Sequence, residues 1–296
     1  MLNKISLMAY ASGEGGVQSG CASGPFVIQQ SLFLRSLIEH GVALDWTIVQ
    51  NDSFLTLRKE DIIQKMCQQL AEAVSNSIKK KQFFVVLGGD HSSAIGTWSG
   101  VYDAIHPSEE LGLIWLDAHM DSHTPETTLS GRIHGMPLAA LLGYGYPALT
   151  SILHDAPKIK PENLCLICVR SFEQGEEALL KRLNVRIYFI EEVKQRGFKN
   201  VLQEALSIVS QNTSRYGLSL DLDVLDPQDA PGVDVKEPDG IAASDLLATI
   251  PTLFSDPRLI GLEIAEFNPS QDRKQCTEKL IVDLLKMVVR NKKNDQ

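Results

Sequence analysis

The chain has 296 residues, of which 44% are hydrophobic and 22% are charged, and its formal net charge is −9. This composition excludes a disordered, collagen-like or coiled-coil protein. The negative charge argues against a nucleic-acid partner, and the lack of any run of 18 apolar residues argues against a membrane span.

Apolar runs alternate with amphipathic segments from one end of the chain to the other. The expected strands are Ile5–Tyr10, Phe83–Gly88, Gly112–Leu116, Leu164–Val169, Arg186–Ile190, Gly217–Asp221 and Leu259–Ile264. The expected helices are Phe26–His40, Ile62–Lys79, Ser93–Ile105, Met136–Leu142, Glu176–Leu183, Asn200–Ser210, Ala243–Phe254 and Glu278–Val289. Val/Ile/Leu-rich strands separated by helices indicate a parallel sheet that is covered on both faces.

The remaining segments fit a single α/β domain over residues 1–290, followed by a polar C-terminal tail over 291–296. Ile5–Ala11 is short and follows a single positive charge, so we expect a strand there and not a signal peptide. Two long loops, Ser12–Gly24 and Pro125–Gly131, are expected near a functional site. The apolar face of the last helix, 278–289, suits core packing better than a subunit contact.

The cysteines are few and odd in number, which fits a reducing cytoplasm better than a secreted disulfide framework. They are Cys21, Cys67, Cys165, Cys168 and Cys276. Cys165 and Cys168 form a C-x-x-C pair inside an apolar run. We expect ordinary core cysteines there, because strand spacing points residues i and i+3 to opposite faces.

Polar side chains follow four of the expected strands. They are Asp90-His91, Asp117-Ala118-His119-Met120-Asp121, Asp221-Leu222-Asp223 and Glu266. Ligands of open parallel sheets bind beyond the carboxyl ends of the strands, so these side chains are candidates for one site.

The spacing within these groups predicts a metal centre. Residues i, i+2 and i+4 of an extended chain face one side, so Asp117, His119 and Asp121 can converge, as can Asp221 and Asp223. With His91 they supply four carboxylates and two imidazoles, and two divalent ions would balance the four negative charges. Oxygen and imidazole ligands suit Mn²⁺, and also Mg²⁺, Fe²⁺ or Zn²⁺.

Each motif also has an ordinary interpretation. A single D-x-D at a strand end is usually a turn or a cap, and only the joint occurrence favours metal binding. We expect Asp90 to support the ligands from behind and Asp226, before Pro227, to form a turn. His40, His106 and His154 are expected to be solvated or structural residues without partners.

Three motifs together resemble the signatures of the ureohydrolases, the family of arginase and agmatinase. They are Gly88-Gly89-Asp90-His91, Asp117-Ala118-His119-Met120-Asp121 and Ser219-Leu220-Asp221-Leu222-Asp223-Val224-Leu225-Asp226-Pro227. The resemblance covers nearly the whole chain. It implies one three-layer α/β/α domain with a mostly parallel eight-stranded sheet, two Mn²⁺ ions per chain, and a homo-oligomer, either a trimer or a hexamer.

The resemblance also implies roles for individual residues. The implied metal ligands are His91 and Asp121 on one ion, His119 and Asp223 on the other, and Asp117 and Asp221 between them. Asp121, His134 and Glu266 would be catalytic, with Glu266 pairing with the substrate guanidinium. His134 matches a proposed proton shuttle, although it could instead orient a substrate carboxylate.

The implied substrate-binding residues are His123, Ser130, Arg132 and Glu173. Ser130 matches a residue that contacts the substrate carboxylate. His123 and Arg132 stand where arginases have asparagines, Glu173 where they have an aspartate, and Val235 where the family has a threonine. The loop 230–236 is closer to those of agmatinase and formimidoylglutamase. The resemblance therefore leaves open which group the substrate carries beyond its guanidino or formimino end.

The expected reaction is hydrolysis of a guanidino group to urea and an amine. A hydroxide bridging the two ions would attack the guanidino carbon, because bound metals lower the pKa of water toward about 7. Arginine is the first candidate substrate. Agmatine, 4-guanidinobutanoate and N-formimidoyl-glutamate remain alternatives, as do a metal-dependent deacetylase and a non-catalytic metal-binding protein.

Overall fold

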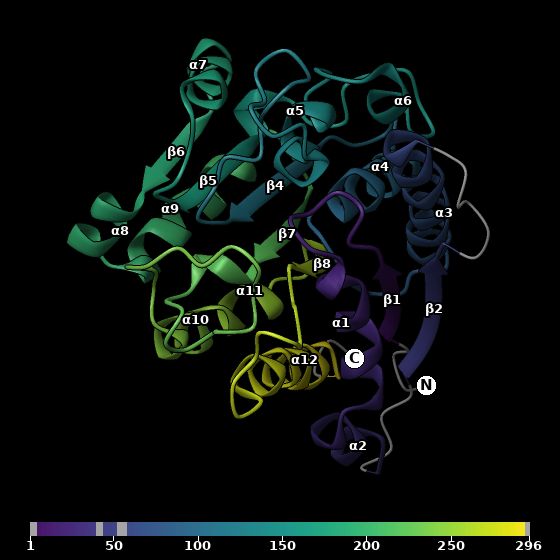
Figure 1. Ribbon diagram of the computed structural model, residues 1–296, viewed down its shortest axis with the longest axis vertical. Helices are drawn as coiled ribbons and strands as arrows, with labels where there is room; N and C mark the ends of the chain where they lie inside the picture. Colours follow the sequence, from purple (N-terminus) through teal and green to yellow (C-terminus); the bar gives the residue numbers. More distant parts are fainter. Residues whose placement is uncertain (1–4, 40–43, 52–57, 294–296) are drawn as a thin grey trace.

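A computed structural model describes residues 5–39, 44–51 and 58–293, arranged around one eight-stranded sheet (Figure 1). The strands are β1 (Ile5–Ala11), β2 (Leu44–Gln50), β3 (Phe84–Gly88), β4 (Leu111–Leu116), β5 (Leu164–Val169), β6 (Arg186–Phe189), β7 (Arg215–Asp221) and β8 (Leu259–Ala265). Their order is β2-β1-β3-β8-β7-β4-β5-β6, and every pairing is parallel. The expected α/β fold is confirmed, with an entirely parallel sheet.

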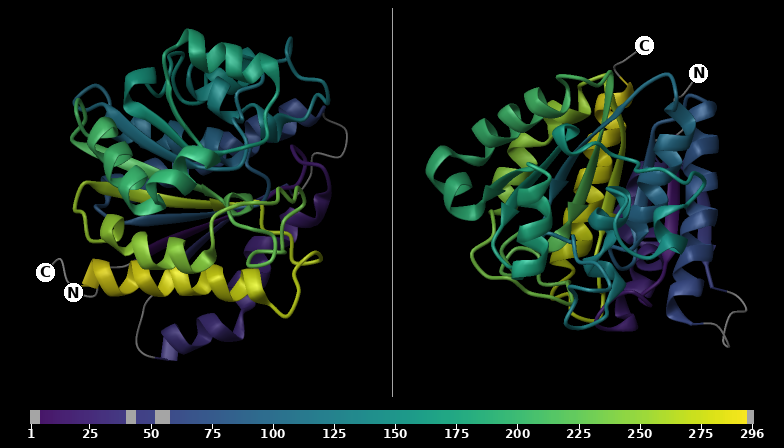
Figure 2. Two further views of the ribbon diagram at one scale, coloured as in Figure 1. Left: turned by 90° about the vertical axis from the view of Figure 1, so that its left-hand side faces the viewer. Right: turned by 90° about the horizontal axis from the view of Figure 1, so that it is seen from above.

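Helices cover both faces of the sheet (Figure 2). They are α1 (Gly24–Gln30), α2 (Leu32–Glu39), α3 (Lys59–Lys79), α4 (Ser93–Ile105), α5 (Pro137–Leu141), α6 (Pro147–Thr150), α7 (Gln174–Arg182), α8 (Ile190–Arg196), α9 (Phe198–Val209), α10 (Ala243–Thr249), α11 (Pro251–Phe254) and α12 (Cys276–Lys293). One apolar cluster joins the sheet to α3, α4 and α5, and another joins it to α8, α9 and α12. Because both faces are covered, β3, β4, β5 and β8 are buried along their whole length.

The structure differs from the expected elements at several places. β2, α6 and α8 were not anticipated as elements. The helix expected over Phe26–His40 is interrupted at Ser31, and Pro251 starts α11 where one continuous helix was expected. α12 runs to Lys293, so residues 291–293 of the expected tail are helical. His40 and residues 294–296 lie outside the described residues.

Cys165 and Cys168 are buried core cysteines, as expected, but the reason given by strand spacing is wrong. Cys168 has a φ of 78°, and the pairing of β5 with β6 shifts register between Ile167 and Val169. This bulge turns Cys168 into the same apolar cluster as Cys165. All five cysteines are free thiols.

His106 and His154 lie at the end of α4 and in the loop beyond α6. The His106 ring stacks on Tyr102 with 4.6 Å between centroids. His154 Nε2 lies 2.8 Å from Asp103 Oδ1, so the expectation that these histidines lack partners is wrong. Asp226 forms the expected turn, accepting a hydrogen bond from the Gln228 N–H through Oδ1.

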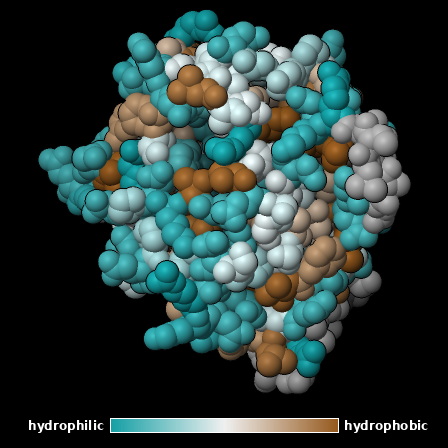
Figure 3. All heavy atoms as spheres, viewed as in Figure 1, coloured by the Kyte–Doolittle hydropathy of each residue, from teal (hydrophilic) through white to brown (hydrophobic). Residues whose placement is uncertain are grey.

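The surface is mostly hydrophilic on the face seen in Figure 3, with apolar side chains in small groups. The large hydrophobic residues that are exposed include Val17, Leu129 and Phe172. Among the described residues, none of the helices has the length and apolarity that a membrane crossing requires.

Candidate metal centre

The four central strands, β3, β8, β7 and β4, carry the candidate site at their carboxyl ends (Figure 1). His91 follows β3 by one tight turn, and Asp117 directly follows β4. β7 ends at Asp221, and Glu266 directly follows β8. Because these strands are adjacent and parallel, their last residues meet at one edge of the sheet.

The first group of side chains gathers around His91. His91 Nδ1 lies 3.3 Å from Asp117 Oδ2, 2.9 Å from Asp121 Oδ2 and 3.1 Å from Asp221 Oδ2. His91 and Asp117 are almost fully buried. Asp121 reaches the group with a φ of 47°, a left-handed backbone that an aspartate adopts only at some cost in free energy.

The second group gathers around His119, and Asp117 belongs to both groups. His119 Nδ1 lies 2.9 Å from Asp223 Oδ2 and 3.5 Å from Asp117 Oδ1. Asp117 therefore presents one carboxylate oxygen to each histidine. The other ring nitrogen of His119 lies 3.5 Å from Glu237 Oε1, a neighbour that the sequence had not suggested.

Backbone N–H groups hold these carboxylates in place. The N–H of His119 donates to Asp117 Oδ1 at 2.7 Å, and that of Ala118 donates to Asp223 Oδ1 at 3.1 Å. The N–H of Asp223 donates to Asp221 Oδ1 at 2.9 Å. Asp221 and Asp223 thus keep their Oδ2 atoms for the histidines. The short turns after β4 and β7 set this geometry.

The cluster contains more carboxylates than groups that can carry a positive charge. Burial and the nearby Asp117 carboxylate raise the pKa of Asp121 to about 7. Burial and the charges of Asp223 and Asp117 also raise the pKa of Asp221. Burial by itself lowers the pKa of His91, but its three carboxylate neighbours outweigh this and raise it. Further cations would relieve the repulsion.

Two orphaned atoms show that the residues fit a divalent ion. His91 Nδ1 and Asp121 Oδ2 are buried and have no hydrogen-bond partner in the described part of the chain, although they are 2.9 Å apart. Buried polar atoms without partners are rare in proteins. Oxygen and imidazole donors without sulfur suit Mn²⁺ and similar hard or borderline ions.

Asp90 lies next to the cluster and orders the glycine-rich loop that follows β1. Its carboxylate accepts hydrogen bonds from the N–H groups of Gly15 and Ser92 at 3.1 and 3.0 Å. A Cβ on Gly89 would lie 1.9 Å from the Ser12 carbonyl oxygen. Only a glycine at position 89 therefore allows the loop after β1 to lie this close to the end of β3. Asp90 therefore supports the site without facing the two histidines.

Glu266 joins the cluster to a second set of side chains. Its Oε1 accepts hydrogen bonds from the His91 N–H at 2.8 Å and from His134 Nδ1 at 3.1 Å. Burial lowers the pKa of His134, but the hydrogen bond and charge of Glu266 outweigh it and raise this pKa to about 9. A protonated His134 beside an ionised Glu266 is the resulting state at neutral pH.

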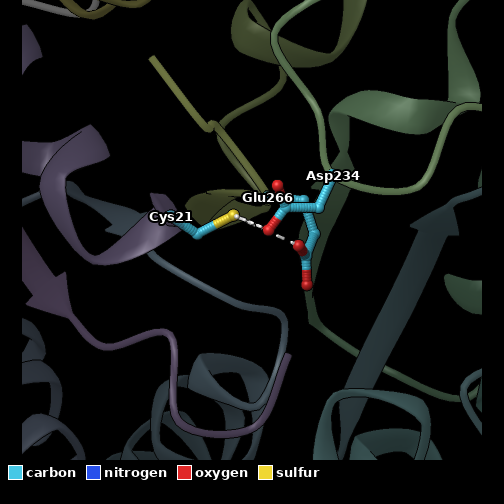
Figure 4. A group of neighbouring side chains, drawn as sticks. All are labelled: Cys21, Asp234 and Glu266. Atoms are coloured by element: carbon cyan, nitrogen blue, oxygen red, sulfur yellow. Dashed lines mark hydrogen bonds between the residues drawn. The ribbon is translucent and has the colours of Figure 1, made fainter. Parts of the chain in front are cut away.

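The other oxygen of Glu266 faces a thiol (Figure 4). Cys21 Sγ lies 3.5 Å from Glu266 Oε2 and 3.3 Å from Asp234 Oδ2. Burial and the two carboxylates raise the pKa of Cys21 far above its usual value, so the thiol stays protonated. A thiol is a weak donor, which leaves Glu266 Oε2 with most of its negative charge.

A pocket of about 310 Å³ opens above these groups. All expected site residues except His91 and Asp117 line it, together with Val17, Gly135, Ser171, Phe172, Glu176, Val235 and Glu237. Carboxylates and imidazoles form its floor. Ser130 and Arg132 lie exposed at its outer part.

His123 pairs with two carboxylates on the pocket wall. Its Nε2 contacts Glu173 Oε2 and lies 3.4 Å from Glu176 Oε2, while its Nδ1 lies 3.1 Å from Thr127 Oγ1. Glu173 caps α7, and Glu176 completes the capping box through the Glu173 N–H. The usual capping box begins with Ser or Thr, so a glutamate at its first position is a weak signal, and the sequence did not assign Glu176 to the site.

Comparisons with known proteins agree on one family. Residues 4–289 match the profile described as the Arginase family. An arginase from Brevibacillus brevis is 36% identical over 99% of both chains.

Solved structures give the same result. A crystal structure of arginase from Bacillus subtilis superposes with a TM-score of 0.87 at 34% identity, over 97% of this chain and 98% of that one. An Entamoeba histolytica arginase in complex with L-ornithine gives 0.89 at 27% identity, over 98% of both chains. The chain belongs to the arginase family.

Proposed function

We propose that the protein hydrolyses L-arginine to L-ornithine and urea with the help of two divalent metal ions, Mn²⁺ first among them. Family membership makes the chain a hydrolase of guanidino C–N bonds. Relatives at 34–36% identity over nearly the whole chain are named arginases, and this favours arginine among the guanidino compounds. The observation that carries the proposal is the meeting of six ligand-type side chains beneath a pocket that also contains Glu266.

The metal ligands in this proposal are the two groups around His91 and His119. His91, Asp121, Asp117 and Asp221 would hold one ion, and His119, Asp223, Asp117 and Asp221 the other. When bound, such ions lower the pKa of water and so make hydroxide available near neutral pH.

The chain's own residues would position arginine and move protons. Glu266 would hold the guanidinium through Oε2, with a charge-assisted hydrogen bond that orients the group. Asp121, whose pKa is raised to about 7 by burial and by the Asp117 carboxylate, would accept the proton that leaves the attacking water. As the C–N bond breaks, this proton goes to the departing nitrogen, and His134 exchanges protons with solvent.

The outer part of the pocket would bind the amino-acid end of arginine. Ser130 and Arg132 are suited to the α-carboxylate, because they offer a hydroxyl and a guanidinium. Glu173 is suited to the α-ammonium group. Its carboxylate would then be shared between that group and His123, its present partner. These four residues are the ones with which we expect substrates to be discriminated.

We further propose that the protein acts as a homo-oligomer, a trimer or hexamer, in the cytoplasm. The family resemblance supports the oligomer, and five free cysteines support a reducing compartment. We also propose that the chain through α12 forms one domain, because a single sheet connects all its layers.

A substrate panel tests the proposal. The Mn²⁺-loaded protein is assayed for urea release from arginine, agmatine and 4-guanidinobutanoate, and for formamide release from N-formimidoyl-glutamate. We expect arginine to give the highest kcat/KM. Turnover of another compound alone would contradict the choice of arginine, and no turnover of any of them would contradict the hydrolase itself.

A further inference from the structure

A buried carboxylate lies directly behind the His91 group and has no role in the chemistry described so far. Glu263, in β8, is fully buried. Its Oε1 accepts hydrogen bonds from Ser93 Oγ at 2.7 Å and Thr97 Oγ1 at 2.9 Å. Its Oε2 accepts from Trp98 Nε1 at 3.1 Å and Ser219 Oγ at 2.9 Å. All four partners are neutral, so hydrogen bonds alone compensate for its burial.

The packing of α4 against the sheet makes this arrangement possible. A Cβ on Gly217 would lie 2.0 Å from the Trp98 ring, so the glycine in β7 makes room for the indole. Ser219 is two residues further along the same strand and therefore lies on the same face. The Trp98 N–H and the Ser219 hydroxyl thus reach the same oxygen of Glu263.

This network fixes the direction of the Ser219 hydroxyl. An indole N–H can only donate, so Glu263 Oε2 must act as an acceptor. The Ser219 hydroxyl donates its single proton to Glu263 Oε2, so Ser219 Oγ can then only accept a hydrogen bond. His91 Nε2 lies 3.0 Å from Ser219 Oγ. The hydrogen bond forms only when His91 Nε2 carries the proton.

The opposite ring nitrogen of His91 faces the metal-binding carboxylates. With the proton on Nε2, a neutral His91 has its lone pair on Nδ1, the atom that lies 2.9–3.3 Å from Asp121, Asp221 and Asp117. That atom is one of the two orphaned atoms of the cluster. Trp115 stacks on the ring with 4.4 Å between centroids and so limits its rotation.

We propose that Glu263 and Ser219 are positioning residues that hold His91 in the Nε2–H tautomer, with Nδ1 presented to the metal. The inference rests on the proposed function, in which His91 is a metal ligand. Partners behind a ligating histidine commonly determine its tautomer and change metal affinity by about 10–100-fold when removed. Here a neutral hydroxyl transmits the effect of a carboxylate.

The test compares Ser219→Ala with a matched control, Thr97→Val. Both changes remove one hydroxyl donor from Glu263, but only Ser219 also contacts His91. Mn²⁺ content and affinity are measured on the full-length protein by competition with a chelator of known affinity. We expect Ser219→Ala to lower the affinity for one of the two bound Mn²⁺ ions by about 10–100-fold. Thr97→Val should leave both affinities within about threefold of wild type.

Ser219→Cys serves if the alanine variant does not fold. Its thiol is slightly larger than the hydroxyl, occupies the same position and is a poorer hydrogen-bonding group, so the affinity for one ion should fall to an intermediate extent. Unchanged affinity in a folded Ser219 variant would overturn the inference, as would an equal loss in Thr97→Val. Fewer than two bound ions in the wild-type protein would contradict the proposed function instead. Arginine turnover plays no part in this readout.

Discussion

At the scale of single residues, the two oxygens of Glu266 have different tasks. Oε1 accepts hydrogen bonds from the His91 N–H and from His134, whereas Oε2 has, among the described residues, only the weak thiol donor of Cys21. Glu266→Gln can keep the His91 hydrogen bond through its amide oxygen but loses the charge. We expect kcat/KM for arginine to fall on the order of 100-fold, because a charged contact to the reacting group is lost.

Asp234→Asn is the matched control for this change. Asp234 lies in the same group of side chains as Glu266 (Figure 4), but it is held by Cys21 and Asn268 and does not line the pocket. We expect it to alter kcat/KM by less than about fivefold. Steady-state assays with both variants decide the matter, and a Glu266→Gln enzyme as active as wild type would exclude guanidinium binding by this carboxylate.

The sequence identified the ligand-type residues because their spacing follows the period of a strand. Asp117, His119 and Asp121 alternate along one stretch of chain, and that alternation is visible without a structure. Ser219 and Glu263 could not be found in this way. They come together only through the pairing of β7 with β8, which no local pattern encodes.

At the scale of elements, Arg170 ties the loop after β7 to the end of β5. Its guanidinium donates to the carbonyl oxygens of Asp223 at 2.6 Å and of Glu237 and Pro238 at 2.9 Å. Arg170→Ala should lower the free energy of unfolding by about 1.5 kcal/mol, because a charged donor to three carbonyl oxygens, one of them on the buried Asp223, is lost. Urea denaturation measures this change.

The same variant should also weaken Mn²⁺ binding, since the loop carries Asp223. Arg58→Ala is the control, because Arg58 is exposed and pairs with Asp61, three residues further along the chain at the start of α3. Exposed pairs of this kind contribute little to stability. Equal effects of the two substitutions would refute the role of Arg170 as a tie between β5 and this loop.

Asp103 links α3 to α4 and makes stability depend on pH. Burial raises its pKa, but hydrogen bonds from Lys79, Ser75 and His154 outweigh this and hold the pKa well below 3.8. A carboxylate with a lowered pKa in the folded state stabilises the protein above the unfolded-state pKa. That contribution is lost as the pH falls through the folded-state pKa.

Asp103→Asn should therefore destabilise the protein near neutral pH by about 0.5–1 kcal/mol, a figure reduced for solvent screening at this partly exposed site. The difference from wild type should shrink as the pH is lowered below about 4. Denaturation curves from pH 7 to pH 3 measure it, with Asp245→Asn, at an exposed position of α10, as the control. A difference that grew at low pH would contradict this account.

Elements were predictable where their own residues determine them. The buried strands and long amphipathic helices could be predicted from apolar periodicity. β2 was missed because it is a half-exposed edge strand with little continuous apolar sequence. The break at Ser31 depends on a distant contact, since Ser31 Oγ donates to Glu278 Oε1 at 2.6 Å. Pro251, in contrast, was a readable signal for a new helix.

At the scale of the whole molecule, metal binding should stabilise the fold. The ligands come from three central strands and converge only in the folded chain, so ions bind the folded state preferentially. Mn²⁺ at about 100 times its Kd should contribute about 2.7 kcal/mol per site. This corresponds to a rise in Tm of roughly 4–5 °C per site for a domain of this size.

Thermal unfolding with and without Mn²⁺ measures this rise, and a chelator should reverse it. Asp121→Asn should reduce the shift, because it removes a charge that compensates for one ion. A Tm that does not respond to Mn²⁺ would mean that the folded chain has no preference for the ion.

The order of the strands also determines when the protein becomes functional during its synthesis. β8 is the last strand to be made, yet it lies in the middle of the sheet, between β3 and β7. Until β8 inserts, the strands β2, β1 and β3 are not hydrogen-bonded to the strands β7, β4, β5 and β6. Glu266 is also missing from the floor of the pocket at that stage. A nascent chain still short of this strand would be an inactive, incompletely closed precursor, so activity should appear in a single step, once β8 has entered the sheet.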